Sequence, residues 1–370
     1  MAGIYFHIPF CKRLCNYCDF YRSVKLQLLP QVVEAMRAEL AAQTDFLTDH
    51  KIRTIYFGGG TPSLLAPHIM QEFVEQVSRQ FDCSEVEEVT AELNPDDVTE
   101  EYVEALRRTS VNRVSLGVQS LSDAELQFMG RRHSAAQAVQ AVRRLQAAGF
   151  DNISVDVIFG VDGYGEDVLR QTLEGVIDMG VQHISAYHLT IEEGTSFGRA
   201  LAKGTMRCVE ESRSEAEFAL VHQMVTEAGF EHYEVSNFAL PGRRSRHNSS
   251  YWTGDEYLGI GPGAHSFAGD VRRWCGQRVE EYIGGVEYGS ERLSQRDCLN
   301  EYLMTSLRRA EGISTALIGE RFGEDARRRV ERSAEPHLKT GWLIKDGDRL
   351  KIPAERFLVS DAVISTLFEV

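Results

Sequence analysis

The sequence contains no run of about 18 apolar residues, the length that a membrane-spanning helix needs. It begins directly with GIYFHIPF after Met-Ala, without the charged and apolar regions of a secretion signal. A basic excess is also missing, because 55 acidic residues outnumber 40 lysines and arginines and give a net charge of −15. We therefore expect a cytoplasmic protein that does not bind nucleic acid, whose phosphates need a basic surface.

Paired cysteines are missing as well. The chain has seven cysteines, an odd number, and a reducing compartment disfavours disulfides. Four of them are scattered along the chain, as small buried apolar residues usually are: Cys83, Cys208, Cys275 and Cys298. The other three fall within eight residues of FCKRLCNYCDFY (10–21), at Cys11, Cys15 and Cys18.

Short β-rich runs alternate with segments whose apolar residues recur at three and four positions. The predicted strands cover 3–8, 53–58, 88–93, 113–118, 152–160 and 183–189, and the predicted helices cover 29–46, 67–81, 100–108, 135–148 and 168–179. Strands that are apolar on both faces and alternate with helices indicate βαβ units and a parallel sheet. Six such units favour a complete or partial (β/α) barrel, and a doubly wound sheet is the alternative.

The rhythm changes after Gly269. From about Ser294 the pattern predicts two helices, then a hairpin with a turn at Asp346-Gly347-Asp348, and a last helix over 358–368. This order is typical of a small winged-helix-like domain. Such domains often bind DNA, but the negative net charge favours a structural or partner-binding role here. We predict an α/β protein with a barrel and its extension over 1–290 and a C-terminal domain over 291–370.

Three thiols in one short loop allow several interpretations. A structural zinc site has four ligands, and His7 could supply the fourth. A disulfide with a spare thiol is a weak interpretation for a cytoplasmic protein, because its compartment is reducing. A [4Fe–4S] cluster with three cysteine ligands would leave one iron open, in the way that catalytic metal sites keep a free position.

The C-x3-C-x2-C spacing after a first strand resembles that of the radical S-adenosylmethionine superfamily. The resemblance implies a partial TIM-like barrel and a cluster whose open iron chelates S-adenosylmethionine. One electron then cleaves that cofactor to a 5′-deoxyadenosyl radical. The run FGGGTPS follows the second predicted strand, where this family receives the methionine group; alone, it would indicate only a tight turn.

Polar residues end or occupy the next three predicted strands: Glu92, Gln119 and Asp156. An unpaired carboxylate is costly to bury. Each residue alone is explained by a loop cap, but three at equivalent strand ends are better explained by one shared polar ligand.

Further motifs follow in order along nearly the whole chain, among them AELNPDD, GRRHS, YHLTIEEGTSF, HNSSYW and GIGPGAHSF. Together they resemble the group that contains oxygen-independent coproporphyrinogen III oxidase and the heme chaperone HemW. Three features favour the chaperone branch. Phe20 stands where the oxidase has a further cysteine, the first strand starts at Gly3 without the oxidase's N-terminal extension, and HNSSYW matches the heme-binding H-N-x-x-Y-W motif.

The resemblance assigns the site residue by residue. Cys11, Cys15 and Cys18 would bind the cluster, and His247 would bind heme. The positions that would hold S-adenosylmethionine are Tyr5, Tyr17, Gly59, Gly60, Thr61, Glu92, Gln119, Arg131 and Asp156. Some of these hold a second S-adenosylmethionine in the oxidase, and the missing fourth cysteine leaves that number open here. Arg243, Arg244 and Arg246 could pair with heme propionates.

Three functions remain open at this point. The first is a heme chaperone with a [4Fe–4S] cluster and S-adenosylmethionine, which passes heme to an acceptor protein, takes electrons from a reductant protein and contacts a membrane transiently. The second is the oxidase, which decarboxylates two propionates of coproporphyrinogen III. The third is a zinc-stabilised barrel with a binding role only.

Overall fold

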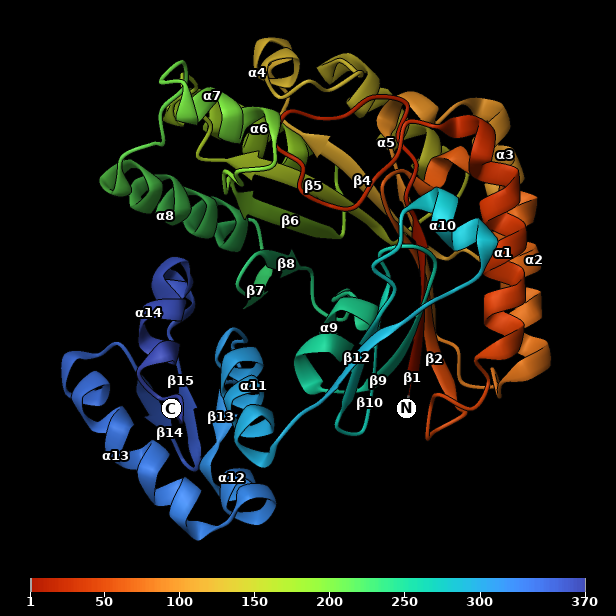
Figure 1. The fold of residues 1–370 in the computed structure, drawn as a ribbon. Coiled ribbons are helices and arrows are strands. Elements are labelled where there is room, and N and C mark those ends of the chain that lie inside the picture. The colour runs from red at the N-terminus through yellow and green to blue at the C-terminus, as the bar shows by residue number, and fades with distance from the viewer. Residues whose placement is uncertain (1, 370) are drawn as a thin grey trace.

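A computed structural model describes residues 2–369 and shows six parallel strands in sequential order (Figure 1). They are β1 (Ala2–Ile8), β2 (Ile52–Gly59), β3 (Glu88–Leu93), β4 (Arg113–Gln119), β5 (Ile153–Phe159) and β6 (His183–His188). Each strand pairs with the next one along the chain, whereas a doubly wound sheet reverses direction after its first strands. The barrel prediction is therefore confirmed, and each of the six predicted strands lies within two residues of its observed ends.

Helices cover the outer face of these strands. They are α1 (Leu29–Ala42), α2 (Pro67–Gln80), α3 (Glu100–Leu106), α4 (Asp123–Phe128), α5 (Ala135–Ala147) and α6 (Glu166–Asp178). Side chains alternate along a strand, so Val114, Leu116 and Val118 of β4 share one buried face in the hydrophobic core. Gly149 and Gly229 follow the ends of helices in the left-handed conformation, with φ of +92°, as C-terminal cap glycines do.

The sheet continues beyond the six parallel strands on both edges, which the sequence pattern did not predict. Next to β1 lies β9 (Glu256–Ile260), which is followed outward by β10 (His265–Ala268), β11 (Val271–Trp274) and β12 (Gly289–Arg292). Next to β6 lie β8 (Asn237–Ala239) and β7 (Glu231–Glu234). The twelve strands end at β12 and β7 without closing on each other, so the barrel is partial.

Four further helices belong to the barrel region: α7 (Ser196–Ala202), α8 (Glu211–Glu227), α9 (Arg246–Thr253) and α10 (Val279–Gly284). Three short 3-10 turns lie in the same region: η1 (Leu26–Leu28), η2 (Pro62–Leu64) and η3 (Pro95–Asp97). Figure 1 places α9 at the lower end of the barrel, beside the starts of β1 and β2 and facing the C-terminal domain. Within residues 2–369, none of the helices combines the length and the apolar character required to cross a bilayer.

The C-terminal part folds as four α-helices and a small antiparallel sheet of order β13-β15-β14. Its elements are α11 (Gln295–Leu307), β13 (Ile313–Ser314), α12 (Thr315–Phe322), α13 (Glu324–Thr340), β14 (Ile344–Asp346), β15 (Arg349–Lys351), η4 (Ala354–Val359) and α14 (Ser360–Ser365). The predicted hairpin is confirmed. The predicted last helix is present but shorter than expected: α14 lies within the predicted range of 358–368, and the 3-10 turn η4 precedes it.

Candidate functional site

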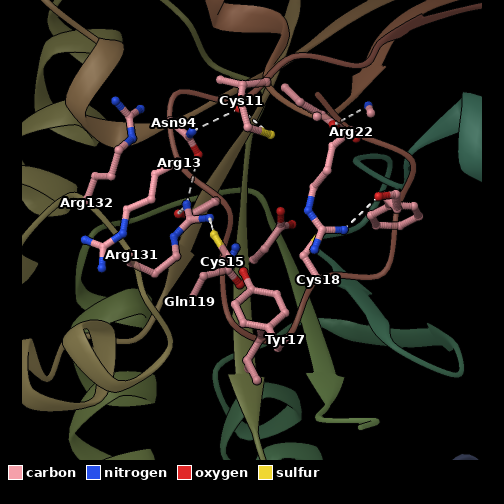
Figure 2. Close-up of a pocket in the computed structure, with 18 of the residues that line it drawn as sticks. Cys11, Arg13, Cys15, Tyr17, Cys18, Arg22, Asn94, Gln119, Arg131 and Arg132 are labelled. Atoms are coloured by element: carbon pink, nitrogen blue, oxygen red, sulfur yellow. Dashed lines mark hydrogen bonds between the residues drawn. The ribbon is translucent and has the colours of Figure 1, made fainter. Parts of the chain in front are cut away.

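A cavity of about 380 Å³ opens at the carboxyl ends of the barrel strands, beneath the cysteine loop (Figure 2). It brings together residues that lie far apart in the sequence. The predicted site residues that line it are Cys11, Cys15, Cys18, Tyr17, Gly59, Gly60, Thr61, Glu92, Gln119, Arg131 and Asp156. Tyr5 and His247 are not among the lining residues.

Backbone hydrogen bonds fix the cysteine loop over this cavity. The Cys11 amide donates to the carbonyl oxygen of Ser23 (3.0 Å), which ties the two ends of the loop together. In the middle of the loop, Asn16 donates its backbone amide to Met129 (2.9 Å) and its side-chain amide to Phe128 (2.7 Å). The loop is therefore held against the end of α4 by groups that the cysteine spacing alone does not reveal.

The three cysteine side chains all come from the cysteine loop and line the cavity. Thr61 Oγ1 lies 3.5 Å from Cys11 Sγ, and Arg131 Nη1 lies 3.5 Å from Cys15 Sγ. Burial raises the pKa of the Cys11 and Cys18 thiols above the ordinary value. Among residues 2–369, no three His, Cys, Asp or Glu side chains converge as ligands of a single ion would. All three thiols line one cavity, and three cysteine ligands are what a [4Fe–4S] cluster with one open iron requires, whereas a structural zinc ion takes four ligands.

The glycine run lets the β2 backbone approach both the loop and the cavity. Gly59 has φ of +106°, a conformation that side chains with a Cβ disfavour. A Cβ added to Gly60 would lie 2.8 Å from the Phe10 carbonyl oxygen, which is backbone and cannot rotate away. Glycine is thus required at Gly60 to seat the cysteine loop beside β2.

Glu92 and Asp156 place two carboxyl groups inside the site. Glu92 accepts hydrogen bonds from the Tyr56 hydroxyl (2.8 Å) and from the Gly59 amide (3.1 Å). Burial raises the pKa of Glu92 to about 7 and that of Asp156 to about 6, although hydrogen bonds to each carboxyl oppose the shift. Neither carboxyl group has a salt-bridge partner within the described part of the chain, so both suit a cationic ligand such as a sulfonium or an ammonium group.

Gln119 ends β4 in a strained conformation. Its φ of +67° makes it the one non-glycine residue of the described chain with a left-handed backbone, and a register irregularity separates it from Leu116. Strain of this kind collects at functional sites. It turns the Gln119 side chain, which is buried, into the cavity lining.

Arg131 contributes in a way that the sequence did not indicate. Besides Cys15, its guanidinium donates to the Asn94 side-chain oxygen (2.9 Å) and to the Gly117 carbonyl oxygen (2.6 Å), as Figure 2 shows in part. A Cβ on Gly117 would lie 2.9 Å from Arg131 Nη2, so this glycine makes room for the guanidinium. A hydrogen bond to a ligating sulfur is one of the groups that set a cluster's reduction potential.

Sequence reasoning missed several lining residues, including Asn94, Ser115 and Tyr187. All three lie on or just after barrel strands, as Glu92 and Gln119 do, so the same signal of polar residues near strand ends could have found them. Asn94 also donates to Thr61 Oγ1 (3.3 Å) and thereby connects the ends of β2 and β3.

Tyr5 lies inside the barrel below the cavity instead of in its lining. Its hydroxyl is hydrogen-bonded to His7 Nδ1 (3.2 Å), and its ring would be 2.8 Å from a Cβ on Gly58. The pleat of β1 explains this position: Tyr5 and His7 share the inner face, and His7 is two residues closer to the cysteine loop. In this conformation the Tyr5 hydroxyl is directed to His7.

His247 lies at the other end of the barrel, completely buried. Its Nδ1 is hydrogen-bonded to Thr54 Oγ1 (2.8 Å) and its Nε2 to the Tyr251 hydroxyl (2.9 Å), while its ring stacks on Tyr56 at 4.9 Å between ring centroids. Burial lowers the pKa of His247 to about 3, so the ring is neutral. Both nitrogens are occupied, and neither is free to bind iron in this conformation.

The arginines before His247 also separate into two groups. Arg243 binds the exposed Asp151 (3.2 Å), whereas Arg244 and Arg246 line a second cavity near α9. Arg243 does not line that cavity, and the expectation that the three arginines pair with heme propionates stays a prediction.

Comparisons with known proteins agree with this geometry. A profile of the Radical SAM superfamily matches residues 5–176, and a profile of the HemN C-terminal domain matches residues 293–358. The chain is similar to the structure of coproporphyrinogen III oxidase (HemN) from Escherichia coli, with a TM-score of 0.84, 18% identity and coverage of 99% of this chain and 90% of that one. At this identity the likeness shows the fold.

The fold and the cysteine-lined cavity are those of a radical S-adenosylmethionine protein, and the residues present fit a [4Fe–4S] cluster with S-adenosylmethionine. Among curated relatives, the "Heme chaperone HemW" of Mycobacterium tuberculosis is 34% identical over 99% of this chain and 94% of its own length. That of Lactococcus lactis is 34% identical over 84% of this chain and 82% of its own. The mouse "Radical S-adenosyl methionine domain-containing protein 1, mitochondrial" is 30% identical over 99% and 87%. The chain belongs to this HemW family.

Proposed function

We propose that this chain is a heme chaperone that binds heme and passes it to an acceptor protein. The observation that carries the proposal is the 34% identity to a heme chaperone over 99% of the chain. The cluster and S-adenosylmethionine together supply one-electron chemistry when bound. The chain's own residues bind and orient these groups and exclude water from them.

Phe20 supports the chaperone over coproporphyrinogen oxidation. The oxidase has a further cysteine at this position by resemblance, whereas here an apolar side chain stands at the rim of the cavity. Phe20 is 70% exposed, so it is available at the surface of the cysteine loop.

Residue roles follow from the cavity lining. Cys11, Cys15 and Cys18 hold the cluster. The remaining residues of the predicted set that line the cavity hold S-adenosylmethionine: Tyr17, Gly59, Gly60, Thr61, Glu92, Gln119, Arg131 and Asp156. Tyr5 supports this site from below through His7.

His247 is proposed as the heme ligand with one condition. Because Nε2 is hydrogen-bonded to Tyr251 and the ring is buried, iron can reach it only after α9 moves away from the barrel. Heme binding through His247 should therefore be slow compared with diffusion, and faster in a Tyr251→Phe variant, which lacks this hydrogen bond.

The proposed partners are heme, a heme-acceptor protein and a reductant protein, with a transient contact to a membrane during transfer. Leu14, Phe20 and Val24 expose apolar side chains around the cluster loop, and the basic Arg13 lies beside them. Such a surface suits an acidic reductant. The cytoplasm is the proposed compartment, and all seven cysteines are free thiols, as a reducing environment requires.

A paired assay tests the function. The reconstituted protein is incubated without oxygen with coproporphyrinogen III, a reductant and S-adenosylmethionine, and in parallel it is titrated with heme. We expect heme binding with a shifted Soret band and no protoporphyrinogen IX. Accumulation of protoporphyrinogen IX would overturn the chaperone proposal, and an unchanged Soret band in His247→Ala would remove His247 as the ligand.

A further inference from the structure

The inner face of β4 carries an arginine to which the cofactor site gives no role. The even-numbered residues of this strand belong to the hydrophobic core, so its odd-numbered residues face the inside of the barrel. Three of them line the cofactor cavity: Ser115, Gly117 and Gln119. The fourth, Arg113, lies deeper, is 1% exposed, and is the one buried lysine or arginine among residues 2–369.

The Arg113 guanidinium has no direct partner. Its Nε and Nη1 atoms lack a hydrogen-bond acceptor among the described residues, and the group forms no salt bridge with them. A buried charge without compensation is costly, because it has lost its hydration. Other barrels fill this interior with branched apolar side chains. A cation in this place therefore requires negative charge nearby.

Glu92 and Asp156 carry the carboxyl groups that supply this charge. They lie on β3 and β5, the two neighbours of β4 in the sheet. Ser115, two residues from Arg113 on the same face, pairs in register with Glu92 and donates to Asp156 Oδ1 (3.4 Å). Burial raises the pKa of Glu92 to about 7 and that of Asp156 to about 6, and the positive charge of Arg113 opposes burial at both.

The histidines and tyrosines around these charges are neutral. Burial, followed by the charge of Arg113, lowers the pKa of His247 to about 3 and that of His183 well below the ordinary value. Burial also raises the pKa of the tyrosines that face Arg113 or the two carboxyl groups, so their hydroxyls stay protonated: Tyr5, Tyr17, Tyr56, Tyr187, Tyr233 and Tyr251.

Two other charged groups at the barrel interior already have partners. Glu88, at the start of β3, accepts hydrogen bonds from two backbone amides at the start of α9 (2.9 and 3.0 Å). The Arg131 guanidinium faces Asp156 from the cavity and donates to a side-chain oxygen (2.9 Å) and a carbonyl oxygen (2.6 Å) there. Glu92 and Asp156 are therefore the carboxyl groups best placed to balance Arg113.

We propose that Arg113 is the internal counter-ion of the cofactor cavity, a positioning residue that keeps Glu92 and Asp156 as carboxylates for the cationic part of S-adenosylmethionine. Arg113 acts through these two groups and does not touch the cofactor, since it does not line the cavity. The binding of S-adenosylmethionine by the carboxylates rests on the residue roles proposed above, whereas the charge balance rests on the buried groups alone.

The first test measures S-adenosylmethionine binding to the cluster-loaded full chain by equilibrium dialysis between pH 6 and pH 9. Arg113→Met removes the charge and keeps an apolar side chain in the space, and Arg113→Lys keeps the charge. Arg273→Met is the matched control. Arg273 also lies on a strand, forms no salt bridge and has two unpartnered guanidinium nitrogens, but it packs between the rings of Phe46 (4.0 Å) and Tyr288 (3.9 Å).

We expect Arg113→Met to weaken binding about tenfold at pH 7, because loss of the charge raises the pKa of both carboxyl groups by about one unit. The loss should shrink to about twofold at pH 9, where both groups are ionised in either protein. Arg113→Lys should stay within about threefold of the wild type at pH 7, and Arg273→Met within about twofold. Circular dichroism checks that each variant is folded.

The second test needs no cofactor. Infrared difference spectra between the wild type and Glu92→Gln isolate the carboxylic-acid band of Glu92, and its loss with rising pH reports ionisation. The band should disappear around pH 7 in the wild type, and about one pH unit higher when the same pair is compared in the Arg113→Met background. A wild type that keeps the band at pH 9 would overturn the charge balance, even if Arg113→Met does not fold.

An equal loss of affinity at pH 7 and pH 9 would make Arg113 a packing residue and overturn the proposal, as would an equal loss in Arg273→Met. A shifted infrared band with unchanged affinity would overturn the role of the carboxylates toward S-adenosylmethionine. A wild type that does not bind S-adenosylmethionine would overturn the proposed residue roles, while the infrared comparison still decides the charge balance. Heme binding is measured separately, so failure of this proposal is distinguishable from failure of the chaperone function.

Discussion

The two ends of the barrel place carboxyl groups in opposite electrostatic surroundings. At the cysteine end, Glu92 forms no salt bridge among the described residues, and burial raises its pKa to about 7, although hydrogen bonds from Tyr56 and Gly59 and the charge of Arg113 oppose this shift. At the arginine end, which is the opposite end near α9, burial also acts to raise the pKa of Glu311, but the hydrogen bond from Arg244 and the charge of Arg309 outweigh it, and that pKa lies below its ordinary value. At the cysteine end a carboxyl group is available for a positively charged ligand. At the arginine end carboxylates form salt bridges with arginines, which fixes the positions of the guanidinium groups.

This difference follows from strand direction. The carboxyl ends of parallel strands meet at one rim, where loops of any length bring polar side chains together, as in other barrels. The opposite rim is closed here by α9 and the C-terminal domain, and its charges are arranged in pairs. Chemistry is thus expected at the first rim and recognition at the second, and four variants can sharpen or break this division.

Cys15→Ala should have the largest effect. We expect iron and sulfide content after anaerobic reconstitution to fall to background, because a cluster with two cysteine ligands is not retained. Far-ultraviolet circular dichroism should be unchanged, since the barrel core does not include this thiol. Cys208→Ala, an exposed cysteine outside the loop, is the control and should keep its iron. A Cys15→Ala protein with normal iron content would show that the loop is not the cluster site.

Glu92→Gln should weaken S-adenosylmethionine binding about 10- to 100-fold, the usual value of one charged hydrogen bond. The wild-type affinity should rise between pH 6 and 8, because Glu92 and Asp156, with pKa values of about 7 and 6, lose their protons in this range. In the variant the part of this rise due to Glu92 should be missing. Equilibrium dialysis across this pH range measures both effects, with the exposed Glu174→Gln as control.

Glu92→Gln should weaken ligand binding but stabilise the folded protein. A carboxyl group with a raised pKa favours the folded state below the unfolded value and loses this contribution as pH rises through about 7. Without ligand, Glu92→Gln should therefore be more stable than the wild type at pH 8, by about 1 kcal/mol, and show a smaller gain at pH 5. A destabilised variant at pH 8 would mean that the hydrogen bonds from Tyr56 and Gly59 to the carboxylate outweigh the cost of burying its charge.

His247→Gln tests the opposite rim. Because the pKa of His247 is about 3 when folded, the unfolded chain takes up a proton below pH 6.5 and the folded chain does not. The contribution of the neutral, buried His247 to the free energy of unfolding is therefore complete above pH 6.5. It decreases by about 2 kcal/mol between pH 7 and pH 5. Denaturant unfolding at both values should show a smaller pH dependence in His247→Gln, while the exposed His68→Gln should match the wild type. Equal slopes in all three proteins would place His247 in a more open environment.

Phe20→Ser should have the smallest effect. The side chain is mostly exposed, so the free energy of unfolding should change by less than about 0.5 kcal/mol. Iron content should be unchanged in both Phe20→Ser and Phe20→Cys, because three ligands already complete the protein's share of the cluster. A gain of coproporphyrinogen oxidation in Phe20→Cys would mean that this one residue separates the two branches of the family.

The sequence predicted the cysteine rim far better than the arginine rim. The six parallel strands are apolar on both faces, so their runs are visible without any knowledge of the fold, and polar residues near their ends stand out. The strands β7 to β12 have three to five residues each and mix polar with apolar side chains, which leaves no clear period. The helix α9 is mostly polar and buries His247 alone among its side chains, so its sequence resembles a loop.

Other parts of the site depend on distances that no local pattern contains. Arg53 and Arg309 are separated by more than two thirds of the chain, and only the folded barrel places them in one cavity. Tyr5 was assigned by resemblance to the cofactor, but the pleat of β1 directs its hydroxyl to His7. In both cases the tertiary structure, through strand register and domain contact, determines the neighbours.

The left-handed backbone of Gln119 has a consequence for the evolution of this protein. A side chain in that conformation costs about 1 kcal/mol or more, which glycine would avoid. Gln119→Gly should thus give a more stable barrel with a poorer cavity. Selection for thermal stability alone would replace this residue, so its glutamine marks a place where the protein gives up robustness to keep a side chain in position.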